Sequence, residues 1–259
     1  MKQELRLFFI ALQFLTRVPV PGWVGFQPAW LHQSARHFPA VGLCIGAVAA
    51  AMLWSAAHFW SALISVLLSM AATVWLTGAF HEDGLADTCD GLGGAVSRER
   101  ALAIMKDSRL GTYGAVGLLL VLALKAAAVH ALALRDLPAV LALLPLAHAW
   151  SRTATVLLLR ALPYGGDAEH AKAKPLAQQI DGHGLMVALA WAAIAGLAAA
   201  LLVPPEALLW ALLAAAAVTL FMARWLRRRL GGYTGDALGA TQQFSELAIY
   251  LAALAALSR

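Results

Sequence analysis

The sequence predicts an all-α, polytopic integral membrane protein, a helical bundle of about seven transmembrane helices with an interfacial amphipathic helix at the N-terminus. The chain is 61% hydrophobic and only 13% charged, and its mean hydropathy is +0.74. A soluble domain usually has about 25% charged residues. No Asp, Glu, Lys or Arg lies between His37 and His81, a length that accommodates two spans of about 20 residues each. We therefore expect a single transmembrane domain over residues 1–259.

Several apolar stretches are long enough to cross a membrane. Turn residues separate some of them, because Ser55–Ser61, Arg135–Pro138 and Pro204–Glu206 each predict a tight hairpin between antiparallel helices. The expected spans cover residues 39–57, 61–80, 110–134, 137–159, 184–203, 206–223 and 238–257.

Residues 1–36 are predicted to lie on the cytoplasmic surface of the membrane. Lys2, Arg6 and Arg17 fall on one side of a helical wheel, and Phe8 and Leu12 fall mostly away from them. This pattern is typical of an interfacial amphipathic helix. Arg17 interrupts the apolar run and no small-residue cleavage site follows, so we expect this segment to be retained, unlike a signal peptide.

The distribution of Lys and Arg predicts a cytoplasmic N-terminus. With this orientation only Arg135 and Arg259 lie on the opposite side, which agrees with the positive-inside rule. The cytoplasmic basic residues are Lys2, Arg6, Arg17, Arg36, Arg98, Arg100, Lys106, Arg109, Arg160, Lys172, Lys174, Arg224, Arg227, Arg228 and Arg229. The net charge of +5 therefore reflects membrane topology, and we do not expect nucleic-acid binding.

An acidic segment follows the second expected span. Glu82, Asp83, Asp87 and Asp90 occur together, and no Lys or Arg lies between Arg36 and Arg98. If the segment continues the preceding helix, Asp83, Asp87 and Asp90 share one face, and Glu82 lies about 100° away as an outer ligand. Unpaired anions at a membrane boundary are costly, and carboxylate oxygens suit Mg²⁺ or Mn²⁺. The alternative is a solvated cytoplasmic loop over residues 81–109.

A second segment, Lys106–Gly114, enters the third expected span. Lys106 and Arg109, the hydroxyls of Ser108 and Thr112, and two glycines before a helix N-terminus are the ingredients of a phosphate site. A basic membrane anchor with a glycine turn would have the same composition.

A third segment, Gly231–Ala240, enters the last expected span and contains a lone carboxylate, Asp236. Asp236 could complete a metal site or act as a base. It would be equally ordinary as an acidic residue in the first turn of a helix.

Charged residues also lie within the expected spans, where they are functional candidates. Arg152 and Glu246 could pair or line a substrate cavity, whereas Lys125 is nearer the other side and is expected to snorkel. His148 is expected to be a packed residue. The loop Tyr164–Gln179, with Lys172 and Lys174, fits either a substrate lid or a solvated connector.

Together these motifs resemble the cobalamin synthase (adenosylcobinamide-GDP ribazoletransferase) family. The resemblance rests on Phe14–Pro19, Thr77–Gly91, Lys106–Gly114 and Gly232–Ala240, and it extends from about residue 8 to the C-terminus. Several motifs in the expected order are more specific than any single pattern. The chain departs from the family at Glu82, where another residue is often found, and the 163–178 loop varies among members.

The resemblance implies a catalytic domain in the bacterial inner membrane, with its active site on the cytoplasmic face. Such enzymes transfer the cobinamide phosphate of adenosylcobinamide-GDP to α-ribazole or its 5′-phosphate and release GMP, with Mg²⁺ as cofactor. A homo-oligomer or a complex with other enzymes of the pathway is left open.

This reaction suggests a role for each candidate residue. Metal held by the aspartates would neutralise the diphosphate, and a carboxylate would orient or deprotonate the acceptor hydroxyl. The expected metal ligands are Asp83, Asp87, Asp90 and Glu82; the expected phosphate-binding residues are Lys106, Arg109, Arg152, Ser108 and Thr112; the expected bases are Asp236 and Glu82.

Two other functions remain as alternatives. A CDP-alcohol phosphotransferase of lipid head groups also has an acidic helix at the membrane face, but this chain has Asp87 where that motif has Arg, and lacks the final Gly-x3-Asp-x3-Asp. An ion-coupled transporter usually has its site near the midplane within paired repeats, and no repeat is visible here.

Overall fold

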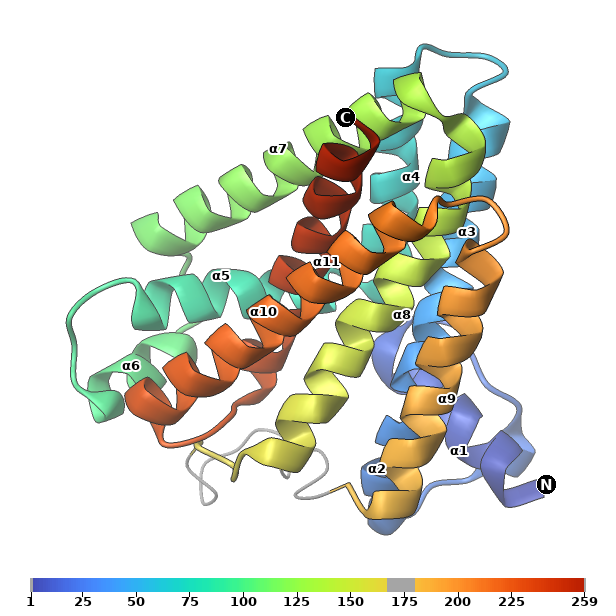
Figure 1. Ribbon diagram of the computed structural model, residues 1–259. Coiled ribbons are helices and arrows are strands. Elements are labelled where there is room, and N and C mark those ends of the chain that lie inside the picture. The colour runs from blue at the N-terminus through green and yellow to red at the C-terminus, as the bar shows by residue number, and fades with distance from the viewer. Residues whose placement is uncertain (1, 167–179, 259) are drawn as a thin grey trace.

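The computed structural model describes residues 2–166 and 180–258, whose regular structure is helical apart from one parallel bridge between Tyr164 and Tyr233 (Figure 1). Two short 3-10 turns, Gly22–Val24 and Ala35–His37, flank the second helix. The α-helices are α1 (Lys2–Leu15), α2 (Pro28–Ser34), α3 (Phe38–Ala56), α4 (Ala62–Thr77), α5 (Phe80–Leu92), α6 (Arg98–Met105), α7 (Thr112–Arg135), α8 (Leu137–Ala161), α9 (Gly182–Ala199), α10 (Pro205–Leu230) and α11 (Gly235–Leu257).

The structure confirms an all-α, polytopic membrane protein. Each of the seven expected spans coincides with a helix: α3, α4, α7, α8, α9, α10 or α11. By length and apolar composition, five helical segments of the described residues can each cross a membrane, or six if α4 and α5 count as one span. The prediction of about seven such helices is therefore too high by this criterion.

Helix α11 does not meet this criterion, and α4 meets it only together with α5. Helix α11 runs through the middle of the molecule and packs against α5, α7, α8 and α10 (Figure 1). Gln242, Gln243 and Glu246 are buried on it, at 0%, 2% and 1% exposure. A helix enclosed by other helices can carry polar groups that find partners inside the protein, so it need not be apolar on every side.

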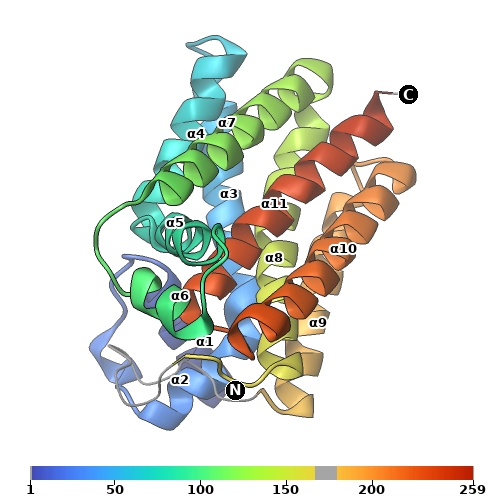
Figure 2. The same cartoon turned by 90° about the vertical axis from the view of Figure 1, so that its left-hand side faces the viewer.

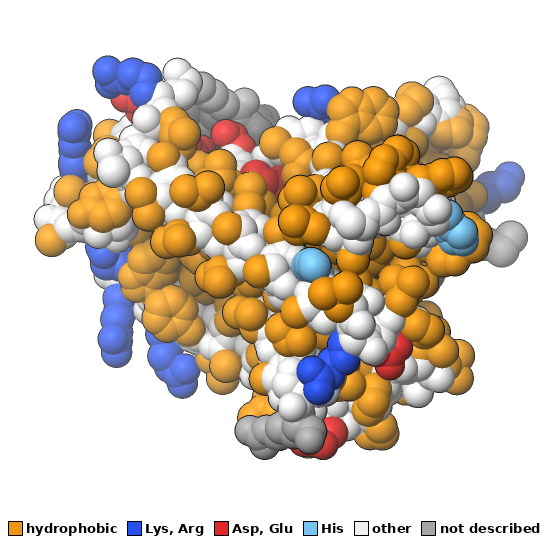
Figure 3. Space-filling model, turned by 90° about the horizontal axis from the view of Figure 1, so that it is seen from above, with side chains coloured by type: hydrophobic (Ala, Val, Ile, Leu, Met, Phe, Trp, Pro, Cys, Tyr) orange, Lys and Arg blue, Asp and Glu red, His pale blue; other side chains and the backbone are white. Residues whose placement is uncertain are grey.

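The loops fall at two ends of the molecule in the grouping that the charge distribution predicts. In Figure 1 the α3–α4 and α7–α8 turns and the C-terminus lie toward the top, whereas α1, α2, α6 and the α10–α11 turn lie toward the bottom. Seen from the top, hydrophobic side chains cover most of the face, and several Lys and Arg side chains gather at its left-hand edge (Figure 3).

The acidic segment is a separate helix: it does not continue the second span, and residues 81–109 contain α5 and α6 in place of the expected loop. Helix α4 ends at Thr77, Gly78 and Ala79 adopt left-handed conformations with φ of 68° and 59°, and α5 leaves at 88° to α4. Figure 2 shows α5 nearly end-on, with α6 below it and α7 above it. Gly78 reaches a positive φ at no steric cost, which is why the chain turns here.

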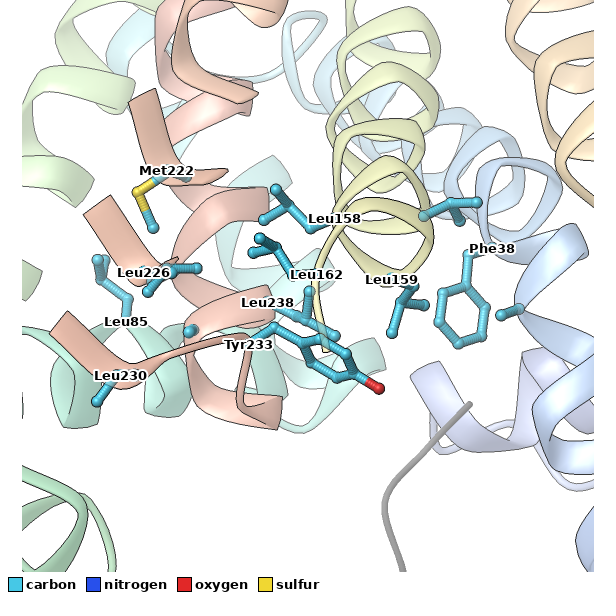
Figure 4. Packing of buried hydrophobic residues seen from close by; sticks show 14 of the residues in the cluster. Phe38, Leu85, Leu158, Leu159, Leu162, Met222, Leu226, Leu230, Tyr233 and Leu238 are labelled. Carbon is cyan, nitrogen blue, oxygen red and sulfur yellow. The ribbon is translucent and has the colours of Figure 1, made fainter. Parts of the chain in front are cut away.

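A hydrophobic cluster holds α5 beside the beginning of α11. Leu85 of α5 packs with residues of α8 and α10, and Tyr233 and Leu238 complete the cluster near the α10–α11 turn (Figure 4). Leu85 and Tyr233 are only 0% and 1% exposed. Burying side chains of this size contributes about 1.5–3 kcal/mol each, so this cluster fixes the acidic helix against the rest of the fold.

Close backbone contact joins α3 and α8. A Cβ atom added at Gly42 or Gly46 of α3 would collide with backbone atoms of His148 or Pro145 in α8. Glycines four residues apart let membrane helices approach closely, so that packing and backbone dipoles contribute more. This contact forms one side of the bundle that surrounds α11.

Candidate active site at helices α5 and α11

Helix α5 presents the three aspartates on one face, as predicted. Asp83, Asp87 and Asp90 are separated by four and three residues within the uninterrupted helix Phe80–Leu92, a spacing that places side chains one above another. Asp83 is exposed, and Asp87 and Asp90 are half-buried. The face is therefore open to solvent at its Asp83 end.

Asp236 lies against α5 near Asp83. A Cβ atom added at Gly84 would lie 2.8 Å from the backbone oxygen of Asp236, so α5 and the first turn of α11 are in backbone contact there. Burial, and to a smaller extent the negative charge of Asp83, raise the pKa of Asp236 from 3.8 to about 6. The negative charge of Asp83 thus acts on Asp236, and a cation bound near both carboxylates would relieve this repulsion.

This pair has the donor chemistry that a hard divalent cation requires. Among the described residues, no three His, Cys, Asp or Glu side chains are arranged to enclose a metal by themselves. Mg²⁺ is usually held by one or two carboxylates, several waters and substrate phosphates, without a complete protein cage. Asp83 and Asp236, with Asp87 one turn further along α5, therefore fit a Mg²⁺ ion whose remaining ligands are waters and phosphate oxygens of the substrate.

Asp90 is engaged in a structural interaction at the start of α7. Its carboxylate accepts hydrogen bonds from the backbone N–H groups of Gly111 at 2.8 Å and Gly114 at 2.7 Å. A Cβ at either glycine would collide with the Asp90 carboxylate, which explains these glycines. The expected phosphate site at this helix N-terminus is therefore already occupied by Asp90, because a helix start has few unpaired N–H groups to offer.

Four of the residues expected to bind phosphate, namely Lys106, Ser108, Arg109 and Thr112, lie on the surface at the end of α6 and the start of α7. Lys106 follows the last residue of α6, and Ser108 and Thr112 are exposed. Arg109 is 87% exposed at its side chain and pairs with Asp107, and hydrogen bonds from Arg109 lower the pKa of Asp107 to about 2. Arg109 thus remains available to solvent on one side while its direction is set by Asp107.

Two arginines that the sequence did not single out fix the loops around α5. Arg229 donates to the carbonyl oxygens of Leu92 at 3.2 Å and Gly94 at 2.8 Å, just beyond the acidic helix. Arg98 donates to the carbonyl oxygens of Leu230 and Gly165, both at 2.8 Å. Cations favour the carbonyl ends of helices, but only the tertiary contacts identify which helix each one reaches.

Glu82 points away from the aspartate face, into a buried polar cluster of α5, α7, α8 and α11. Its Oε1 accepts a hydrogen bond of 2.9 Å from Gln243 of α11. The buried polar cluster consists of Glu82, Lys125, His148, Gln242, Gln243 and Glu246. Its position gives no support to Glu82 as a metal ligand beside the aspartates.

The charges within the spans meet in this cluster. Lys125 is only 6% exposed and lies 3.1 Å from Glu246, so the expectation that Lys125 snorkels is wrong. Glu246 contacts His148 at 3.4 Å, and the hydrogen bonds of Arg152 go to His148 in its own helix. Arg152 is thus part of the membrane interior of the protein.

The lysines of the 163–178 loop, Lys172 and Lys174, lie outside the described residues.

Comparison with known proteins identifies the family. A family model of cobalamin-5-phosphate synthases matches residues 7–254, nearly the whole chain and every segment described above. The chain belongs to the cobalamin-5-phosphate synthase family. As a member it is an enzyme of cobalamin synthesis, which agrees with the resemblance seen in the motifs.

Curated relatives cover the full length of this family member. A protein of Leptothrix cholodnii is 63% identical over 97% of this chain and 96% of its own length. Proteins of Albidiferax ferrireducens and Shewanella piezotolerans are 45% and 44% identical, over 97% and 96% of this chain and 98% and 95% of their own lengths. All three are named adenosylcobinamide-GDP ribazoletransferase. No solved structure matches the chain.

Proposed function

We propose that this protein transfers the cobinamide phosphate of adenosylcobinamide-GDP to α-ribazole or α-ribazole 5′-phosphate and releases GMP. The observation that carries the proposal is the pair of Asp83 and Asp236 at the α5–α11 contact, in a chain whose curated relatives bear the name of this reaction. A site with few protein ligands suits a reaction in which both substrates bring phosphate or ribose oxygens.

Mg²⁺ is the proposed cofactor. When bound, it would neutralise the diphosphate and the charge that develops on the departing GMP. Asp83 and Asp236 are the proposed ligands, with Asp87 as the next carboxylate on the same helical face. Asp90, which accepts two backbone hydrogen bonds from the start of α7, orients α5 against α7 and thereby the other aspartates.

The remaining steps belong to side chains around this face. Lys106 and Arg109 would hold phosphate oxygens of the donor, because flexible cations at the α6–α7 surface can reach anions in solvent. Because Asp236 is assigned to the metal, its carboxylate would be held ionised by the cation, so Asp236 is not proposed as the group that accepts the proton of the acceptor hydroxyl.

We also propose an orientation for the enzyme. The excess of Lys and Arg at the end that carries α1, α6 and the α10–α11 turn favours a cytoplasmic position for that end in the bacterial inner membrane. The nucleotide-linked donor would then reach the site from the cytoplasm.

The test is a reconstituted assay. Purified protein in liposomes is incubated with adenosylcobinamide-GDP, α-ribazole and Mg²⁺, and GMP is measured by chromatography. Release of GMP that requires all three components is expected. A parallel sample receives a CDP-linked donor with a lipid alcohol, and activity in that sample alone would contradict the proposal.

A further inference from the structure

The buried polar cluster lies directly behind the face that carries Asp83. Glu82 precedes Asp83 on α5 and is therefore about 100° around the helix, so one side chain faces the protein interior while the next faces solvent. The hydrogen bond from Gln243 to Glu82 ties α5 to charged groups of the membrane interior.

Gln243 connects Glu82 to a lysine in another helix. Its Nε2 donates to Glu82, and its Oε1 accepts a hydrogen bond of 2.8 Å from Nζ of Lys125. Lys125 is also 3.1 Å from Glu246, one turn further along α11. The chain Glu82–Gln243–Lys125–Glu246 therefore alternates acceptors and donors across α5, α11 and α7.

The cluster is closely matched in charge and strongly buried. Lys125, Gln243 and Glu246 are 6%, 2% and 1% exposed. Glu246 pairs with Lys125, and Glu246 and Glu82 both act on Arg152 through their negative charge. In a low-dielectric interior the loss of one partner from such a network is strongly destabilising, because it leaves another polar group buried without compensation. Loss of the Gln243 contact would therefore leave the Glu82 carboxylate with no hydrogen bond from the described residues, since its other oxygen is buried and has none.

Backbone contacts next to the hydrogen bond leave α5 little freedom except rotation or sliding on α11. A Cβ at Gly84 would lie 2.8 Å from Asp236, and a Cβ at Gly239 would lie 3.2 Å from the carbonyl oxygen of His81. Glu82 and Gln243 extend this contact by one turn of α11. A rotation of α5 that breaks the Glu82–Gln243 hydrogen bond would also move Asp83 relative to Asp236.

We propose that Glu82, Gln243 and Lys125 are positioning residues that set the rotation of α5 and hold Asp83 at the distance from Asp236 that a divalent cation needs. This inference rests on the proposed function, because it presumes that Asp83 and Asp236 bind the metal. It replaces the expected roles of Glu82 as a ligand or a base. Outer partners that orient metal ligands typically change metal affinity by about 10–100-fold when removed.

The test is Mn²⁺ binding by the protein in detergent with adenosylcobinamide-GDP present and α-ribazole absent, followed by electron paramagnetic resonance. Gln243→Leu and Lys125→Met are expected to weaken Mn²⁺ binding about tenfold and to change the spectrum of the bound ion, although neither residue can be a ligand. Glu82→Leu should behave in the same way. Glu82→Gln should bind Mn²⁺ within about threefold of wild type, because an amide can still pair with Gln243.

Tyr250→Phe is the matched control. Tyr250 contacts Glu246 at 3.4 Å, so this variant removes a hydroxyl from the same buried region without touching the link to Glu82, and unchanged Mn²⁺ affinity is expected. Thermal unfolding of each variant identifies any that does not fold.

The outcomes separate this inference from the proposed function. Absence of Mn²⁺ binding by the wild type would overturn this inference and the metal site on which it rests, whereas the proposed reaction is judged separately by GMP release. Binding by the wild type that is equal in folded Gln243→Leu and Lys125→Met would overturn the positioning role alone. Loss of binding in Glu82→Gln as severe as in Asp83→Asn would also overturn it, since Glu82 would then act as a ligand.

Discussion

Asp83 and Asp90 share one face of α5, yet the structure gives them different surroundings. Asp83 is exposed and lies near Asp236, whereas Asp90 accepts two backbone hydrogen bonds from the start of α7. The difference arises because α7 begins beside the C-terminal half of α5. Replacing Asp83 is therefore expected to affect turnover, and replacing Asp90 is expected to affect stability.

Asp83→Asn is expected to lower turnover by roughly 100-fold or more with little change in thermal stability. An amide carries no charge and is a poor ligand for a hard cation, but the exposed position makes no contact that folding depends on. GMP release and the unfolding temperature are measured on the same preparation. Near-normal turnover in a folded variant would contradict the metal role of Asp83.

Asp90→Ala should destabilise the metal-free protein by about 1–2 kcal/mol, because two N–H groups at the start of α7 lose their acceptor. Asp90→Asn, which keeps one acceptor oxygen, should lose less. Denaturant or thermal unfolding in detergent with EDTA measures the effect. Equal stability of wild type and Asp90→Ala would show that the cap contributes nothing.

The raised pKa of Asp236 predicts a pH dependence of the metal-free protein. A carboxyl group whose folded pKa is about 6, against 3.8 as the ordinary value, contributes stability below the lower value and loses it as the pH rises through the higher one. The unfolding temperature of wild type, relative to Asp236→Asn, should therefore fall between about pH 4 and pH 7.

Mg²⁺ should offset this loss at neutral pH in wild type but not in Asp236→Asn, because the cation stabilises the ionised carboxylate. Wild-type and variant profiles that run parallel across this pH range, with or without Mg²⁺, would contradict the assigned environment of Asp236.

At the scale of elements, the 88° bend between α4 and α5 places the aspartates of the acidic motif against α11 and α7. A continuous helix would have carried the aspartates away from the bundle along the span axis. Instead Gly78 and Ala79 take left-handed conformations, and α5 lies across α11 and α7. The sequence contained a signal for this turn in Gly78, but a single glycine does not specify the angle.

The α3–α8 contact gives a prediction at the same scale. Gly42→Ala should destabilise the protein by about 1–3 kcal/mol, because the new methyl group would collide with the backbone at His148 and force the helices apart. Gly182→Ala is the control, since no atom lies within 4 Å of a Cβ added there. Thermal unfolding in detergent compares the two, and equal stabilities would contradict the close contact.

At the scale of the whole molecule, the loops divide between two ends as the Lys and Arg distribution predicts. The division follows from long helices that alternate in direction along the chain, with α5 and α6 inserted at one end. α11 is enclosed, which allows polar residues at the centre of a protein whose lipid-facing surface is apolar. The active-site candidates and the buried polar cluster therefore occupy adjacent layers.

Labelling of single cysteines tests the proposed orientation. In a variant with Cys44 and Cys89 replaced by Ala, Ser97→Cys lies just before α6 and Ser258→Cys lies at the end of α11, and both positions are exposed. A membrane-impermeant maleimide added to intact cells should label Ser258→Cys only, and Ser97→Cys should react after permeabilisation. The opposite pattern would reverse the topology.

The sequence by itself determined the class, the positions of the helices and the shared face of Asp83, Asp87 and Asp90, because hydropathy and helical periodicity depend on neighbouring residues. Only the tertiary structure decided that Asp90 caps α7, that Asp236 lies near Asp83, and that Glu82 and Lys125 meet through Gln243. These contacts join residues far apart in the chain, and the 88° turn at Gly78 and Ala79 selects them. Local patterns specify which groups are present, whereas packing specifies which of them meet.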